Sequence, residues 1–239
     1  MRLLAEPFIL AFDTAGAAAS VAVARGKTLL AHHSLSLLHG HAEALLPLID
    51  RIMEEAGLSP AALDQVAVTV GPGGFTGIRV GLAAARGIAL ATGAALLGLS
   101  GFEAVAALFP FDELHGREAH FLLVALESRR DDLYVALFEK SGEVAFGPMS
   151  VMPEALAAAV GKPVLEGGLV VAGDAAHRAA ALLPPSSVRR VEAERVPDAL
   201  GVARAAYRSW TEGVRENGAQ PLYLRPPDVT FPPARRQPG

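Results

Sequence analysis

The chain opens with three apolar strands in close succession, and this feature restricts the possible folds more than any other. Apolar residues predict strands at 8–12, 20–24 and 28–34, joined by a turn of small residues and by Gly26-Lys27. Strands with such short connections pair in antiparallel fashion, because a parallel pair needs a crossover of a dozen or more residues. The opening is therefore an antiparallel meander, which excludes a dinucleotide-binding βαβ unit at this position.

After residue 40 the apolar spacing becomes that of helices alternating with single strands. Residues 41–56 and 77–92 have helical spacing, and strands are predicted at 66–70 and 95–99. Ser100-Gly-Phe-Glu103 is a capping box that begins a further helix ending near Phe109. A meander followed by alternating strands and helices indicates an α/β fold with a mixed sheet.

The second half of the chain is also predicted to be mixed. Its expected strands are 120–126, 133–138, a segment near 143–146 and 169–172, and its expected helices are 153–160 and 174–183. The charged stretch 112–118 is expected to cross between two lobes, and 197–212 is the last long helix. We expect a first lobe of residues 1–110 with 195–225, a second lobe of 111–194 and a flexible proline-rich tail, 226–239.

Composition narrows the function classes. The chain has 21 Lys+Arg against 25 Asp+Glu, and this acidic balance argues against a protein that binds nucleic acid strongly by itself. The complete lack of cysteine excludes disulfides, thiolate zinc sites and a cysteine nucleophile. We find neither a secretory signal nor an apolar run of about 20 residues, so we expect a cytoplasmic protein without a membrane partner.

A glycine-rich loop, Gly71-Pro-Gly-Gly-Phe-Thr-Gly77, separates a buried strand from a helix. Backbone N–H groups and a helix N-terminus in such a loop can hold an anion. However, no Lys-Ser/Thr pair follows the last glycine, and the third glycine comes one position late for a dinucleotide fingerprint. On spacing alone a tight structural turn is therefore favoured over a phosphate site.

Other candidate groups are weaker. Asp13-Thr14, at a strand end, has the groups to hold a metal-bound phosphate, but a turn in which the carboxylate accepts backbone hydrogen bonds is favoured. His32, His33, His39 and His41 are spaced by 1, 6 and 2 residues, unlike helical metal ligands, and are interpreted as polar loop histidines. With no nucleophile elbow either, we predict no catalytic constellation.

Several segments together resemble the bacterial TsaB (YeaZ) family, and the resemblance extends over nearly the whole chain to about Arg225. The segments that carry it are Ile9-Leu-Ala-Phe-Asp-Thr14, His41-Ala-Glu-Ala-Leu-Leu-Pro-Leu-Ile-Asp50, Gly71-Pro-Gly-Gly-Phe-Thr-Gly-Ile-Arg-Val-Gly81 and Pro221-Leu-Tyr-Leu-Arg225. Two positions depart from the family pattern, because members usually have serine where Gly74 stands and aspartate where Glu127 stands.

The resemblance implies an actin/sugar-kinase/Hsp70-like fold in two lobes, each a mixed sheet with helices. It also implies a non-catalytic scaffold that pairs with the paralogous transferase TsaD and the ATPase TsaE. By the same resemblance, these proteins act together in a tRNA-modification pathway. It places a threonylcarbamoyl group on the adenosine next to the anticodon in tRNAs reading codons that begin with A. ATP and a metal belong to partner subunits, no cofactor is expected in this one, and tRNA is contacted only through the complex. The alternatives are an ATPase or kinase of the same fold acting alone, and a metallopeptidase.

The resemblance further implies that the helices 41–56 and 77–91 pack against the matching pair of the paralogue, or of a second copy in a homodimer of the isolated protein. The expected interface residues are His41, Leu45, Leu48, Ile49, Ile52, Gly77, Arg79, Gly81, Leu82 and Ala85. A small-residue stripe, Gly77, Gly81, Ala85 and Ala89, lies either in this interface or in a close packing face within the chain. The remnant phosphate-loop positions are Asp13, Thr14, Gly71, Gly73, Gly74 and Thr76.

Overall fold

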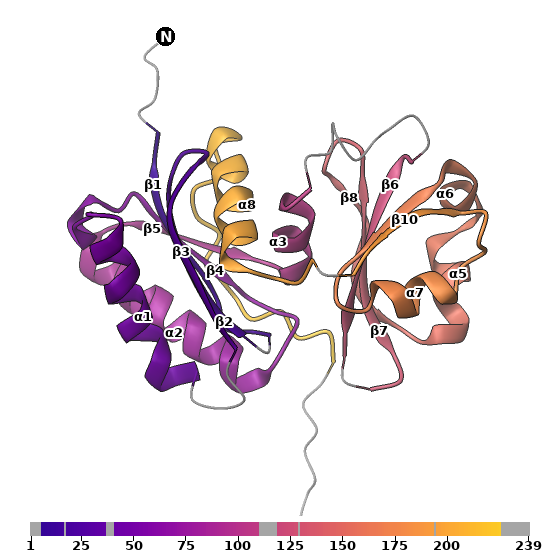
Figure 1. Cartoon of the computed structure of the whole chain (residues 1–239), viewed down its shortest axis with the longest axis horizontal. Coiled ribbons are helices and arrows are strands. Elements are labelled where there is room, and N and C mark those ends of the chain that lie inside the picture. The colour runs from indigo at the N-terminus through magenta and orange to yellow at the C-terminus, as the bar shows by residue number, and fades with distance from the viewer. Residues whose placement is uncertain are drawn as a thin grey trace, which may run out of the picture.

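Two lobes, each with a five-stranded sheet at its centre, make up the computed structural model (Figure 1). The structure describes residues 6–16, 18–36, 41–109, 119–128, 130–193 and 195–225, without the side chains of residues 41–43 and 163. The predicted crossing at 112–118 and the proline-rich tail 226–239 lie outside these ranges.

The first sheet has the strand order β3-β2-β1-β4-β5. Its strands are β1 (Phe8–Asp13), β2 (Ala18–Arg25), β3 (Thr28–Ser36), β4 (Gln65–Thr69) and β5 (Ala95–Leu99). The first three strands pair in antiparallel fashion, with Phe12 opposite Val21, and this confirms the predicted meander. β4 and β5 join it in parallel, with Leu10 opposite Val66.

The second sheet repeats this topology in the order β8-β7-β6-β9-β10. Its strands are β6 (Phe121–Glu127), β7 (Leu133–Glu139), β8 (Val144–Val151), β9 (Leu169–Ala172) and β10 (Val188–Glu192). Again three strands form an antiparallel meander; β9 pairs in parallel with its first member, β6, and β10 pairs in parallel with β9. The two lobes are thus the same mixed-sheet unit built twice, as the expected two-lobed fold requires.

Helices cover both faces of the first sheet, which explains why its inner strands β1 and β4 are buried at almost every position, whereas the edge strand β3 is exposed or half-buried. α1 (His41–Glu55) and α2 (Phe75–Thr92) pack on one face, together with Leu10, Phe12 and Val68. α8 (Ala199–Thr211) packs on the other face against alternate residues such as Ile9 and Ala11. A short 3-10 helix, η1 (Pro60–Ala62), precedes β4.

α3 (Gly101–Ala107) connects the two lobes (Figure 1). The predicted capping box begins it, since Ser100 accepts from the Glu103 backbone and the Glu103 side chain accepts from the Ser100 backbone. Its Ala104 packs with α8 and the first sheet, whereas Phe102 packs against the second sheet. A single short helix therefore belongs to the cores of both lobes.

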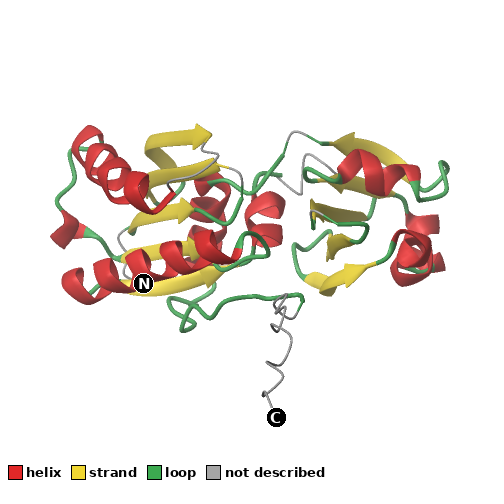
Figure 2. Cartoon of the chain, turned by 90° about the horizontal axis from the view of Figure 1, so that it is seen from below, coloured by secondary structure: helices red, strands yellow, loops and turns green. Residues whose placement is uncertain are grey.

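The outer face of the second sheet carries short helices (Figure 2). They are η2 (Pro153–Ala155), α5 (Leu156–Val160), α6 (Lys162–Gly167) and α7 (Ala176–Ala181). α6 and β10 were not predicted from the sequence, and β8 runs several residues beyond the predicted 143–146. β10 is an edge strand with two exposed arginines, Arg189 and Arg190, so its apolar signal is sparse. Within the described ranges no helix is long and apolar enough to cross a membrane.

Candidate functional site

The glycine-rich loop closes onto the end of β1. The backbone N–H of Gly74 donates to the Ala15 carbonyl over 2.8 Å, and the Thr14 hydroxyl donates to the Gly77 carbonyl over 2.7 Å. A Cβ on Gly73 or Gly77 would overlap the carbonyl oxygens of Ala15 and Thr14, respectively. The structure thus brings the two remnant phosphate segments together, but their polar groups bind each other.

Asp13 is buried at this contact, with a relative exposure of 1%. Its Oδ1 accepts a hydrogen bond of 3.2 Å from the backbone N–H of Ala15, as in the turn favoured from the sequence. Burial raises the pKa of this carboxyl from 3.8 to about 6. The side chain therefore changes charge near neutral pH inside the first lobe.

The remaining phosphate-loop positions have structural roles or face solvent. Gly71 has a φ of +117°, which L side chains rarely adopt, and its carbonyl accepts from the Gly101 N–H over 2.8 Å. Thr76 is exposed in the first turn of α2. Gly74 is the N-cap of α2 and provides no side-chain cap, whereas a Cβ there would have room. The serine typical of the related family would fit at that position.

Most of the residues expected at a partner interface lie in the core of their own lobe. Seven of the ten are buried against the first sheet, and these are Leu45, Leu48, Ile49, Ile52, Gly81, Leu82 and Ala85. Gly77 is partly buried, Arg79 is exposed, and the side chain of His41 lies outside the described residues. These buried side chains position the two helices but cannot themselves present a surface.

The small-residue stripe of α2 is a packing face within the chain. A Cβ on Gly81 would lie 2.5 Å from the Thr14 hydroxyl and 3.3 Å from a methyl of Val68. Ala85 is fully buried, and Ala89 packs against the same core. Of the two alternatives for this stripe, the structure selects close packing between α2 and the first sheet.

The exposed sides of α1 and α2 form an apolar groove with a volume of about 510 Å³. Leu46 of α1 is 53% exposed, and Leu90 near the end of α2 is 89% exposed. The groove is lined by Leu45, Leu46, Val80, Ala83, Ala84, Gly87 and Ile88. Apart from Leu45, these residues were not predicted as interface positions.

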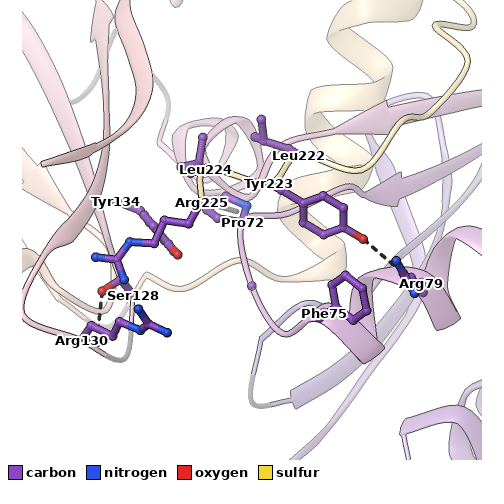
Figure 3. A pocket seen from close by; sticks show the side chains of 11 residues that line it. Pro72, Phe75, Arg79, Ser128, Arg130, Tyr134, Leu222, Tyr223, Leu224 and Arg225 are labelled. Carbon is purple, nitrogen blue, oxygen red and sulfur yellow. Dashed lines mark hydrogen bonds between the residues drawn. The ribbon is translucent and has the colours of Figure 1, made fainter. Parts of the chain in front are cut away.

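A second cavity, with a volume of about 540 Å³, lies between the two lobes (Figure 3). We call it the interlobe pocket. Its lining residues are Pro72, Gly73, Phe75, Arg79, Ser128, Arg130, Tyr134, Leu222, Tyr223, Leu224 and Arg225. The first four come from the glycine-rich loop and α2, the next three from the second lobe, and the last four from the segment after α8. Only the tertiary structure brings these three segments together.

Aromatic and cationic side chains stack in the wall of the pocket that the first lobe provides. The ring of Phe75 stacks on that of Tyr223, with a centroid distance of 5.4 Å. The guanidinium of Arg79 lies 3.6 Å from the Phe75 centroid, and its Nε donates to the Tyr223 hydroxyl over 3.3 Å (Figure 3). The three side chains therefore pack against one another as a single unit in this wall.

The opposite wall depends on a buried carboxylate in the second lobe. Asp132, 1% exposed, accepts hydrogen bonds from the Ser128 hydroxyl over 2.6 Å and from the Ser150 hydroxyl, and it forms an ion pair with Arg225. Burial alone would raise the pKa of Asp132, but these hydrogen bonds and the Arg225 charge lower it overall. The backbone N–H of Leu222 bonds to Val70 over 2.8 Å, so the chain after α8 links both lobes.

Of the four candidate histidines, the structure describes the side chains of His32 and His33, and both lie in a strand rather than in the expected loop. In β3, His32 pairs with Asp198 over 2.9 Å, and His33 pairs with Glu55 over 3.0 Å. His39 lies outside the described residues. No group of three or more potential metal ligands occurs in the described part of the chain.

Glu127, the other departure from the family pattern, pairs with Arg178 over 2.9 Å.

Sequence comparison relates the chain to proteins of tRNA modification. Residues 29–183 match the family model TsaD, described as tRNA N6-adenosine threonylcarbamoyltransferase. An uncharacterized protein of Mycobacterium tuberculosis is 32% identical over 229 residues, which cover 92% of this chain and 93% of that protein. The tRNA threonylcarbamoyladenosine biosynthesis protein TsaB of Escherichia coli is 32% identical over 132 residues, 55% of each chain.

Structural comparison confirms the predicted fold class. YeaZ from Pseudomonas aeruginosa superposes with a TM-score of 0.74 at 27% identity, covering 91% of this chain and all of that one (100%). A ROK hexokinase from Thermus thermophilus has a TM-score of 0.50 at 17% identity, covering 86% of this chain and 99% of that chain. The hexokinase likeness concerns the fold alone, and that fold is the two-lobed arrangement of the sugar kinases.

Proposed function

Since this chain belongs to the TsaD protein family and has TsaB and YeaZ proteins as homologues, we propose that it is a non-catalytic scaffold subunit in threonylcarbamoyladenosine biosynthesis. In this role it pairs with a TsaD-type transferase, and a TsaE-type ATPase joins the pair. The transferase modifies the adenosine next to the anticodon in tRNAs reading codons that begin with A. The partners hold ATP and the metal, and the assembly works in the cytoplasm.

The observation that carries this proposal is the apolar groove between α1 and α2. An apolar groove on the surface of a folded protein favours the docking of a partner's apolar side chains, because its exposure to water is unfavourable. Two small residues of α2, Ala83 and Gly87, line the groove and leave space for a helix of a partner to approach. Leu46 of α1 lines the same groove and is exposed, so its side chain is available to pack against a partner. We propose the α1–α2 pair of the TsaD-type paralogue as the occupant, and a second copy of this chain when the protein is isolated.

The geometry of the glycine-rich loop favours a scaffold over an ATPase or kinase acting alone. Such an enzyme needs an accessible acid and free backbone donors at the β1 end. Here Asp13 is buried, and the Gly74 N–H is bonded to Ala15. The metallopeptidase alternative would need histidines that share one metal site. The two histidines of β3 instead pair with different acids, His32 with Asp198 and His33 with Glu55, and this disfavours that alternative.

Reconstitution tests the proposal directly. Purified TsaD-type and TsaE-type partners and the threonylcarbamoyl-adenylate synthase are incubated with tRNA, with and without this chain, and the modified nucleoside is quantified. Activity that appears only when the chain is added supports the scaffold role. Activity that is indifferent to the chain contradicts it, as does ATP hydrolysis by the chain alone.

A charged substitution in the groove locates the interface. We expect Leu46→Glu to reduce association with the TsaD-type partner at least about tenfold, because the interface would have to bury an unpaired carboxylate. Val214→Glu is the matched control, since Val214 is 47% exposed after α8 and does not line the groove. Sedimentation of each variant mixed with the TsaD-type partner measures the two affinities. Equal association of the two variants would contradict this placement of the interface.

A further inference from the structure

The interlobe pocket has no part in the proposed scaffold contact, yet its lining is specialised. Among its eleven lining residues, three are arginines and none is acidic, although the whole chain has a net charge of −4. A cavity with this charge bias attracts an anion. We propose that the pocket binds the phosphate groups of a single-stranded RNA segment, and the choice of RNA rests on the proposed function.

Arginines line both walls of the pocket, with Arg79 beyond the rings of Phe75 and Tyr223 and Arg130 across the pocket near Ser128 (Figure 3). Arg79 is held by Phe75 and Tyr223, and no carboxylate pairs with it among the described residues. Arg130 is exposed on the facing wall. Nη1 of Arg225 is buried and has no hydrogen-bond partner in the described part of the chain, although Asp132 binds Nη2. A phosphate oxygen would satisfy this donor and gain charge-assisted hydrogen bonds.

The aromatic side chains distinguish a nucleotide strand from a simple anion. Tyr223 is 41% exposed beside Arg79, and Tyr134 faces the same cavity from the second lobe. Unpaired bases stack on such rings, and a stacked base contributes about 1–3 kcal/mol. A volume of about 540 Å³ is in the range of small-ligand sites and suits one or two nucleotides. Alternating cations and aromatics are the pattern that single-stranded nucleic acid sites use.

The small number of arginines predicts weak binding by the isolated chain. Because Asp132 already pairs with Arg225, the pocket offers at most three phosphate contacts, so the slope of log K against log salt concentration is no steeper than about −2 for a single strand. An acidic protein with such a patch needs a partner to bind RNA tightly.

The test uses the full chain and a fluorescent ten-nucleotide single-stranded RNA at about 50 mM salt, with anisotropy as the readout. We expect saturable binding that weakens about tenfold in Arg79→Ala and in Arg130→Ala, with the salt slope reduced by about 0.7 in each. Arg204→Ala is the matched control, because Arg204 is an exposed arginine of α8 that does not line the pocket. Tyr223→Leu should weaken binding without changing the slope.

Three results would overturn the proposal. They are absence of saturable binding, equal affinity of the two pocket variants and the Arg204→Ala control, and saturable binding of AMP without binding of the RNA. The last result would reassign the pocket to a free nucleotide. Circular dichroism and the thermal midpoint exclude unfolded variants. Because this assay needs no partner protein, its failure is distinguishable from a failure of the reconstitution experiment.

Discussion

The hydroxyl of Thr14 donates a 2.7 Å hydrogen bond to the carbonyl of Gly77, which ties the end of β1 to the first turn of α2. The approach is so close that only glycine fits at position 77, since a Cβ there would overlap the Thr14 carbonyl oxygen. The same contact orients α2, and an adjacent side of this helix contributes to the apolar groove. A packing constraint in the core thus determines the position of the proposed interface.

Gly77→Ala should destabilise the protein by roughly 1–3 kcal/mol, because the added methyl group displaces α2 or the β1–β2 turn. Gly87→Ala is the matched control in the same helix, where a Cβ would meet nothing within 4 Å. This control should gain about 0.5–1 kcal/mol, since alanine is the better helix former. Urea unfolding measures both free energies, and equal values would show that the tight contact does not exist.

Asp13→Asn should stabilise the protein at alkaline pH. The folded pKa is raised to about 6 from 3.8, so the native state binds the proton more tightly than the unfolded state. The contribution of the Asp13 carboxyl to the free energy of unfolding is therefore largest below pH 3.8, and it is lost as the pH rises through about 6. At pH 8 the variant should be more stable by up to roughly 3 kcal/mol, at about 1.4 kcal/mol per pKa unit. Unfolding free energies at pH 4 and 8 check this, and a pH-independent difference between the two proteins would contradict it.

The ion pair between His32 and Asp198 should make stability depend on pH in the same direction as Asp13 does, but over a higher pH range. The hydrogen bond to Asp198 raises the pKa of His32 above 6.5, so its contribution is full below 6.5 and is lost as the pH rises through the folded pKa. We expect wild type to exceed His32→Gln by at most about 1 kcal/mol at pH 6, with the difference vanishing near pH 9. Thermal unfolding over this range measures it. A difference that grows with pH would refute the assignment.

Arg225→Ala should destabilise the protein by up to about 3–5 kcal/mol, because it leaves the buried Asp132 carboxylate without its cation. Arg190→Ala is the matched control, since Arg190 is 61% exposed in its ion pair with Glu192. The control should cost less than about 1 kcal/mol. Urea unfolding compares the two, and equal losses would mean that Asp132 does not depend on Arg225.

The local pattern of residues was sufficient to predict most elements. Apolar runs and short turns predicted the meander of β1, β2 and β3, because pairing between neighbouring strands needs only local information. The capping box at Ser100 likewise predicted the start of α3. β10 escaped prediction because an edge strand is stabilised by its pairing with β9, which lies 16 residues or more upstream, and not by its own apolar content.

Only the tertiary structure decided which residues face a partner or a ligand. Helical spacing shows that Leu45, Leu48 and Ile52 share one side of α1, but the packing of that side on the sheet determines that it points inward. Spacing therefore identified the two helices and their apolar side, whereas the exposed groove residues followed from the fold. The interlobe pocket depends even more on tertiary structure, because Arg79, Arg130 and Arg225 are distant in sequence and approach only when the lobes pack.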